Sequence, residues 1–291
     1  ILNSDVDLEA EIEIDETNYA QTALEAAKTF RDSFEDVFVT FRKEDDNLFA
    51  NLVTTNLAKK FEEIQKNSSA IVLMSGTLHS EEVLKHIFGI RDFTIVEAES
   101  LNQGTIEILR TGKEMDCRHS NMNEEMVSRE SYLRALESAI KKSEKPSLIH
   151  VNAFRDLPTT EEFLEMNLTE LVPKEELMAL QKSTDQISLF KSGKITKLFT
   201  TKCARGIDFP GDTCKSVVFT KYTNPNVRHT FWKILHKTHR NYYWEFYRDK
   251  ARREFLQRIY RAVRSKDDHV YVLSPDIRVL QAVRDIQNNG K

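Results

Sequence analysis

Short apolar runs alternate with amphipathic stretches along most of the chain, and this alternation predicts an α/β fold. The apolar runs are β-branched or aliphatic and have the length of strands: 70–75, 105–110, 146–154, 194–201, 214–222 and 269–274. Several are apolar almost throughout, as strands covered on both faces must be. Helical patterns fall between them at 80–90, 123–143, 159–167, 185–193, 242–264 and 277–286. Strands that alternate with such helices indicate parallel βαβ units, hence a parallel sheet flanked by helices.

The first third of the chain has a different pattern. Its first 70 residues are acidic and mostly helical, with one expected strand at 37–41. At 291 residues the chain is long enough for about two domains. We therefore expect an incomplete, mostly helical piece over residues 1–100 and a self-sufficient α/β domain over residues 101–291.

The charge distribution leaves room for a local anion site. The formal net charge is −4, so no overall basic field indicates a nucleic-acid partner. Acidic residues concentrate between positions 5 and 16, whereas 228–264 is rich in arginine and lysine. Any nucleic acid must therefore be held by a local groove, which we expect in the second half of the chain.

The cysteine count excludes several classes of site. Cys117, Cys203 and Cys214 are odd in number and far apart, so they encode neither a disulfide framework nor a zinc or iron–sulfur cage. We expect a reducing, intracellular compartment and no metal site in this chain. No run approaches the roughly 20 apolar residues of a membrane span, so no membrane partner is expected.

The segment 257–264 carries hydrogen-bond donors at helical spacing. On a helix, Gln257, Arg261 and Arg264 fall within one narrow arc, with Phe255 and Ile259 on the opposite side. Arginine suits a phosphate clamp because its guanidinium is planar, always charged and able to form two parallel hydrogen bonds. The alternative is an ordinary surface face whose arginines extend into solvent.

A polar loop follows the strand expected at 194–201. Loops at the carboxyl ends of parallel strands are where α/β folds bind ligands. In this loop Gly206 permits a positive φ, and Asp208 can hold an arginine or a hydroxyl. Two hydroxyls and a cation come just before them: Thr200, Thr201 and Lys202. The alternative is a tight structural turn.

Aromatic and basic residues are interleaved between positions 228 and 253. Proteins that bind single strands use such mixtures, because bases stack on rings while cations follow the phosphates. Trp232 is the ring we select for this role, against the alternative that it is core material. The histidines of the segment have no accompanying cysteine or acid at a metal-like spacing, which again predicts no metal site.

The order of several short motifs resembles a known family. A strand followed by "SGTL" comes first, then a βαβ region, then "GIDFPGD", then "QRIYRAVR" and "KDDHVYVLSPD". This order is similar to motifs III, V and VI of superfamily-two helicases, and the phrases resemble the XPD/DinG group of DNA helicases, nearest to archaeal-type XPD. The resemblance covers roughly residues 37–286.

The resemblance implies a fold and a mechanism. Residues 101–291 would be the C-terminal RecA-like motor domain, and residues 1–100 a remnant of the first motor domain and its insert region, ending in "SGTL". In such helicases ATP lies between the two motor domains, and the second supplies arginines to the γ-phosphoryl group. The implied activity is ATP-dependent translocation on single-stranded DNA and duplex unwinding in DNA repair.

The resemblance also implies roles for individual residues. Arg261 would be the arginine finger, Arg264 its partner and Gln257 a nucleotide-contacting amide. Gly206 and Asp208 would couple the nucleotide to the DNA. Ser75 and Thr77 would link hydrolysis to domain movement, and the strand of DNA would be met by a set at strand ends: Asn152, Phe154, Thr200, Thr201 and Lys202.

Some family features depart or are absent. Tyr260 stands where the family has glycine before the first arginine, and the chain has no G-x-x-x-x-G-K-[ST] loop, no acidic Walker B run and no set of four cysteines. The resemblance therefore implies that ATP and Mg²⁺ are bound mainly by an N-terminal half outside this chain. Any iron–sulfur cluster is also expected only in that half. We expect no appreciable ATP hydrolysis by this chain alone.

The expected partners follow from the same resemblance. They are single-stranded DNA, the N-terminal motor domain and proteins of a repair complex. The expected location is intracellular, and in an archaeal or bacterial cell it is the cytoplasm, at the nucleoid. Two other interpretations remain open. One is a non-catalytic docking or regulatory module with the acidic start as its partner surface. The other is an RNA-directed DEAD-box-like remodeller, favoured by "ARGID" and opposed by "SGTL" and "FPGD".

Overall fold

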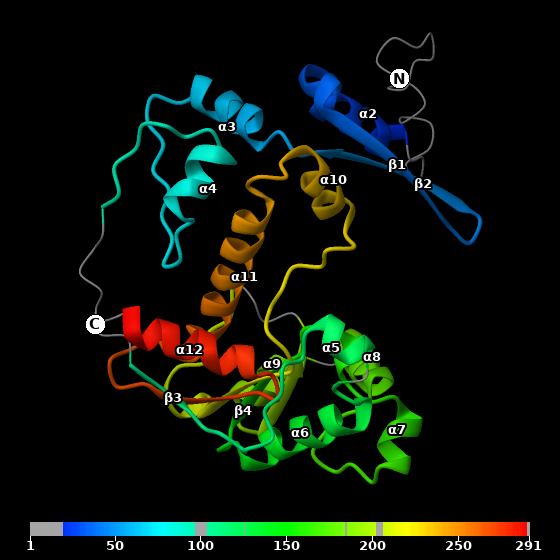
Figure 1. Ribbon diagram of the computed structural model, residues 1–291, viewed down its shortest axis with the longest axis vertical. Coiled ribbons are helices and arrows are strands. Elements are labelled where there is room, and N and C mark those ends of the chain that lie inside the picture. Colours follow the sequence, from blue (N-terminus) through cyan, green and yellow to red (C-terminus); the bar gives the residue numbers. More distant parts are fainter. Residues whose placement is uncertain (1–19, 97–103, 125, 184, 202–205, 290–291) are drawn as a thin grey trace. The chain divides into compact units, whose positions relative to one another are not determined.

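The computed structural model describes residues 20–96, 104–124, 126–183, 185–201 and 206–289 (Figure 1). The chain forms two compact units, each assembled from separate segments. Unit 1 comprises Ile1–Leu73, His79–Phe93 and Pro225–Tyr247, and unit 2 comprises Met74–Leu78, Thr94–Asn224 and Arg248–Lys291. Compactness does not test where one evolutionary domain ends, so the division at residue 100 stays a prediction.

Unit 2 contains the parallel sheet that the alternating pattern predicts. Its strands are β3 (Thr105–Ile108), β4 (Ser147–His150), β5 (Lys197–Thr200), β6 (Ser216–Phe219) and β7 (His269–Leu273), in the spatial order β3-β7-β6-β4-β5. Each neighbouring pair is parallel. The central strands β4 and β6 are buried at every residue. The α/β, RecA-like fold class is therefore confirmed.

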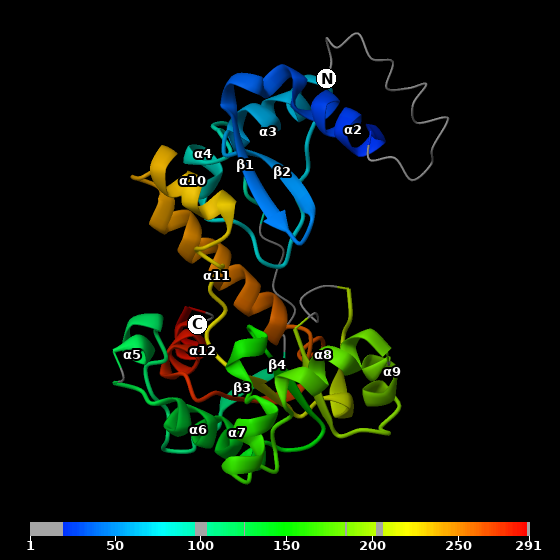
Figure 2. The ribbon, with the colours of Figure 1, turned by 90° about the vertical axis from the view of Figure 1, so that its right-hand side faces the viewer.

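Helices cover both faces of this sheet (Figures 1 and 2). They are α5 (His119–Asn123), α6 (Arg129–Lys142), α7 (Thr160–Glu165), α8 (Lys174–Ser183), α9 (Gln186–Lys191), α11 (Tyr243–Ile259) and α12 (Ile277–Asn289), with single 3₁₀ turns at Phe154–Asp156 and Gly211–Thr213. The crossover helices lie where parallel pairing requires connections of a dozen or more residues.

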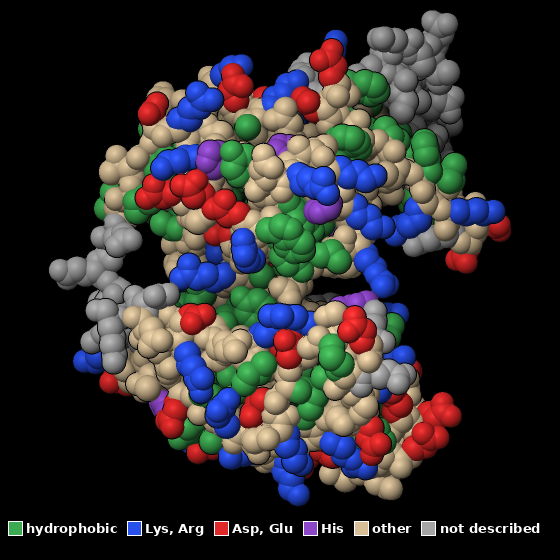
Figure 3. Space-filling view, in the orientation of Figure 1, with side chains coloured by type: hydrophobic (Ala, Val, Ile, Leu, Met, Phe, Trp, Pro, Cys, Tyr) green, Lys and Arg blue, Asp and Glu red, His purple; other side chains and the backbone are tan. Residues whose placement is uncertain are grey.

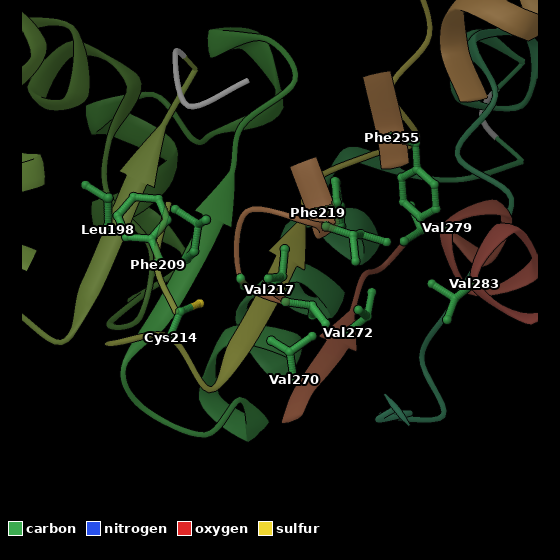
Figure 4. Close-up of a cluster of buried hydrophobic side chains, with 14 of the residues drawn as sticks. Leu198, Phe209, Cys214, Val217, Phe219, Phe255, Val270, Val272, Val279 and Val283 are labelled. Atoms are coloured by element: carbon green, nitrogen blue, oxygen red, sulfur yellow. The ribbon is translucent and has the colours of Figure 1, made fainter. Parts of the chain in front are cut away.

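Side-chain alternation along the strands produces two separate cores in unit 2. Leu148 and Val217 face one cluster, which also contains Phe255 of α11 and which Figure 4 shows in close-up. The next residues on the same strands, Ile149 and Val218, face the other cluster, with α6 and α8. Period-two alternation in strands thus supplies both faces with apolar side chains.

Unit 1 is smaller and mixed. It contains α2 (Ala20–Phe30), a 3₁₀ helix (Arg31–Asp36), β1 (Val37–Glu44), β2 (Asn47–Thr54), α3 (Leu57–Lys66), α4 (Glu81–His86) and α10 (Thr230–Thr238). β1 and β2 form an antiparallel hairpin. The strand expected at 37–41 is confirmed within β1, whereas the sequence pattern missed β2.

One predicted element is wrong, and another is shorter than predicted. The apolar run 70–75 forms no strand, and Val72 and Met74 are 78% and 89% exposed. A strand needs a neighbour to satisfy its backbone, and no strand within the described ranges pairs with this run. The helix expected at 123–143 begins later, at Arg129 in α6, because Ser128 caps its start by accepting from the backbone N–H of Ser131.

The helix expected at 242–264 ends earlier than predicted. α11 stops at Ile259, and the chain continues in turns, with the backbone N–H of Ala262 donating to the carbonyl of Ile259 at 3.0 Å. Arg261 and Arg264 therefore lie beyond the helix that was to align them with Gln257. No helix in the described parts of the chain is both long and apolar enough to cross a bilayer.

Candidate functional site

A pocket of about 360 Å³ lies within unit 2 at the end of α11. Its lining residues are Ser75, Gly76, Thr77, Gln257, Tyr260, Arg261 and Arg264. All seven residues belong to the two segments that the sequence singled out, 73–80 and 257–264. Gly76 lies between the two hydroxyl residues of the first segment, Ser75 and Thr77. The pocket wall therefore combines hydroxyls, an amide, a ring and two guanidinium groups.

Asp208 holds the two arginines together. Its Oδ1 accepts from Nη1 of Arg261 at 2.8 Å and from Nη2 of Arg264 at 2.5 Å. Partial burial opposes ionisation of this carboxyl, but the hydrogen bonds from Arg264 and Arg261 outweigh it, so the pKa of Asp208 lies below its ordinary value. The arrangement is a carboxylate shared by two cations beside the pocket.

The loop that carries Asp208 is fixed through Phe209. The Phe209 ring is fully buried and packs edge-on against Phe190 at 5.5 Å. The backbone N–H of Phe209 donates to the carbonyl of Arg261 at 2.7 Å, which ties the loop to the turn after α11. Gly206, at the exposed start of the loop, has φ of 78°, a conformation that favours glycine.

A second carboxylate, Asp268, fixes the turn that carries Arg264. It accepts from the backbone N–H groups of Arg264 at 2.5 Å, Ser265 at 2.6 Å and Gly211 at 2.8 Å. Burial opposes its ionisation, yet these backbone hydrogen bonds hold the pKa of Asp268 below its ordinary value. Asp268 belongs to "KDDH", a phrase that the sequence marked as family-like without assigning this residue a role.

The amide of Gln257 connects α11 to the 73–80 segment. Its Nε2 donates to Oγ1 of Thr77 at 3.1 Å, and Thr77 is buried. Ser75 Oγ accepts from the backbone N–H of Thr77 at 3.1 Å, which closes a small turn around Gly76. The three donors expected on one helical arc thus share one pocket, although the helix positions only Gln257.

The residues expected to meet a DNA strand lie elsewhere in unit 2. Asn152 follows β4, and its backbone N–H donates to Oγ1 of Thr220 at 2.9 Å. Thr200 is buried at the end of the neighbouring strand β5, and Thr201 donates to Oε1 of Gln181 at 3.0 Å. Phe154, the other residue after β4, packs partly on the core. None of these residues lines the pocket, and Lys202 lies outside the described residues.

Trp232 is a core residue of unit 1. Its side chain is 7% exposed and contacts the rings of Phe231, Tyr243, Phe246 and Tyr247. This burial argues against the predicted stacking of Trp232 on a base, because a ring enclosed by other rings presents no free face. Trp244, another ring of the aromatic and basic segment 228–253, is 55% exposed.

The pocket suits a phosphate group better than a metal ion. Arginines, hydroxyls and an amide can donate to phosphate oxygens, whereas the nearby carboxylate of Asp208 already serves two cations. Within the ranges that the structure describes, no group of three or more His, Cys, Asp or Glu residues could hold a metal. Burial raises the thiol pKa of Cys117 and Cys214 to about 12. The described residues at the pocket therefore do not fit a Mg²⁺ or iron–sulfur site.

The family profile described as the helicase C-terminal domain matches residues 136–289, more than half of the chain. The chain belongs to this helicase family. No curated protein matches it.

Solved structures identify the fold more narrowly as that of XPD helicases. A structure titled "XPD_Helicase" shares 15% sequence identity at a TM-score of 0.62, covering 98% of this chain and 55% of that one. A structure titled "XPD_APO" shares 14% sequence identity at a TM-score of 0.56, covering 94% of this chain and 57% of that one. A structure titled "Structure of S. tokodaii Xpd4" shares 16% sequence identity at a TM-score of 0.53, covering 96% of this chain and 54% of that one. The chain thus spans about half the length of the solved chains it matches, as the motif order predicted.

Proposed function

We propose that this chain is the C-terminal motor part of an ATP-dependent DNA helicase. The whole protein would couple ATP hydrolysis to translocation on single-stranded DNA and to duplex unwinding, in DNA repair. The observation that carries this proposal is the cluster of Arg261, Arg264 and Asp208 at a pocket that Gln257 and Thr77 also line. A docking module has no physical need for two guanidinium groups held beside a pocket by one carboxylate.

The proposed chemistry is stabilisation of charge on a transferred phosphoryl group. Arg261 and Arg264 would exchange their hydrogen bonds to Asp208 for hydrogen bonds to phosphate oxygens, whose charge spreads in the transition state. Mg²⁺ would be held by residues outside this polypeptide and would supply positive charge to the phosphate oxygens. A shift of Gln257 on nucleotide binding would move the 73–80 segment, because the Gln257 amide donates a hydrogen bond to Thr77.

The DNA side of the proposal uses the carboxyl edge of the sheet. Asn152 and Thr201 follow neighbouring parallel strands, at the sheet edge where α/β folds bind their ligands. Gly206 and Asp208 begin the loop that returns from this edge to the arginine cluster, so a strand bound there would act on the same loop as a nucleotide.

The proposal is tested by Arg261→Ala in the complete enzyme. Loss of a transition-state arginine should lower kcat of the DNA-stimulated ATPase by about 10³-fold or more. DNA binding should change little, because Arg261 is not among the residues assigned to the strand. The matched control is Arg284→Ala, which removes an exposed arginine of α12. A normal ATPase in the Arg261 variant would refute the finger assignment.

A further inference from the structure

Unit 1 presents one exposed aromatic ring on an otherwise buried aromatic cluster. Trp244, the second residue of α11, is 55% exposed, whereas its neighbours Tyr243, Phe246 and Trp232 are buried. The Trp244 ring contacts Tyr243 at 5.0 Å and Tyr247 at 5.7 Å between centroids, both edge-on. The hydroxyl of Tyr247 donates to the carbonyl of Pro225 at 2.9 Å. The exposed ring therefore stands on a fixed base.

A basic helix face adjoins this ring. Lys233, His236 and Lys237 are spaced so that they share one face of α10, and all three are exposed. The His236 ring contacts Tyr243 at 4.8 Å, so this face is continuous with the ring under Trp244. Figure 3 shows hydrophobic side chains bordered by Lys, Arg and His near α10. We call Trp244, Tyr243 and this basic face the Trp244 platform.

The charge of this part of unit 1 is opposite to that of the whole chain. Between positions 225 and 247 there are four lysines and arginines and one acidic residue, Glu245, while the whole chain has a formal net charge of −4. A local basic surface on an acidic protein attracts a polyanion to that place and not to the rest of the surface. An exposed indole beside it adds a flat surface on which a base can stack.

We propose that the Trp244 platform binds a single-stranded nucleic acid, with a base stacked on Trp244 and the phosphates along Lys233 and Lys237. The Trp244 indole is exposed. The ammonium groups of Lys233 and Lys237 share one face of α10. This inference deepens the proposed function by naming where unit 1 meets the strand. It rests on that function only for the existence of a strand to bind.

Intrinsic fluorescence tests the platform directly. The chain has two tryptophans, and Trp232 is buried, so Trp244 is the accessible reporter. Oligothymidylate and oligouridylate are titrated separately into the chain over a salt series. Stacking should quench the emission. Trp244→Ala should weaken oligothymidylate affinity about tenfold, as expected for loss of one stacked base. Trp244→Phe should retain most of the affinity and lose the fluorescence response.

The basic face is tested by the slope of affinity against salt. Replacing Lys233 and Lys237 by glutamine should reduce that slope by about 1.4, since each phosphate contact on a single strand contributes about 0.7. The matched control is Phe34→Ala, which removes an exposed ring of unit 1 outside the platform and should change neither affinity nor slope. Thermal melting checks that each variant is folded. The melting temperatures should change little, because the replaced side chains are on the surface.

The outcomes separate the platform from the proposed function. Equal oligonucleotide affinity in Trp244→Ala and the unaltered chain would overturn the platform and leave the helicase proposal standing. No binding of either oligonucleotide at low salt would also overturn it and assign the surface to another partner. Tighter binding of the DNA than of the RNA oligonucleotide would support the platform and identify the strand. ATPase loss in Arg261→Ala is measured separately and concerns only the nucleotide pocket.

Discussion

At the residue scale, the central feature is one carboxylate shared by two arginines. Two guanidinium groups brought to one pocket repel each other, and Asp208 offsets that repulsion by accepting from both. The same carboxylate competes with any phosphate for the two cations. Asp208 therefore both assembles the anion site and opposes its occupation, so a nucleotide has to displace it.

Replacing Asp208 by asparagine separates these two effects. The variant should bind an anionic ATP analogue more tightly at low salt, by about fivefold, because a unit charge several ångströms from the phosphate contributes on the order of 1 kcal/mol. In the complete enzyme, turnover should fall because the arginines lose their fixed acceptor. Analogue affinity is measured by titration calorimetry. Asp212→Asn, at an exposed acid of the same loop, is the control, and weaker analogue binding in Asp208→Asn would contradict this account.

At the element scale, the pocket depends on how a helix ends. α11 stops at Ile259, and the turns beyond it are held by hydrogen bonds to Phe209 and Asp268 instead of by helical ones. The buried Phe209 ring joins the Asp208 loop to the core of unit 2. Loop and helix end therefore form one packed assembly, in which the polar residues face the pocket and one ring faces the core.

Phe209→Ala measures the strength of that attachment. Removing a fully buried ring should lower the free energy of unfolding by about 3–5 kcal/mol, the usual cost of Phe to Ala in a core. Urea unfolding followed by circular dichroism gives the value. Phe41→Ala on β1 removes an exposed ring and should stay within about 0.5 kcal/mol. A loss below 1 kcal/mol for Phe209→Ala would mean that the loop is not anchored through its ring.

At the scale of the whole molecule, a net negative chain can bind nucleic acid only where charge is locally reversed. The proposed contacts are stacking on Trp244 and a short basic face, and both favour an unpaired strand whose bases are accessible. A duplex offers phosphates but hides its base faces within the stack.

Competition between strands tests this expectation. A duplex should displace a labelled oligothymidylate from the chain at least tenfold less effectively than the unlabelled single strand, because stacking is lost while phosphate contacts are retained. Fluorescence anisotropy at fixed salt gives both values. Equal competition by the duplex would show that phosphates alone are recognised, and that the aromatic surface takes no part.

The sequence by itself determined the architecture and most of the pocket. The largely apolar runs at 146–154 and 214–222 predict buried strands, and they contain the central β4 and β6. Motif order identified the helicase resemblance, and the donors Gln257, Arg261 and Arg264 were recognised as one group. These results follow from residue type and local order. Apolar side chains favour burial and arginines bind anions whatever the rest of the fold is.

Only the tertiary structure decided which local patterns are realised. The run 70–75 is as apolar as a buried strand and forms none, because a strand depends on a neighbour that local sequence does not specify. Trp232 and Trp244 have similar sequence surroundings, yet one is enclosed by rings and the other is exposed. Arg261 and Arg264 meet through Asp208, more than 50 positions earlier, and not through helical spacing. Packing between distant segments sets these outcomes, and periodicity along the chain carries no information about it.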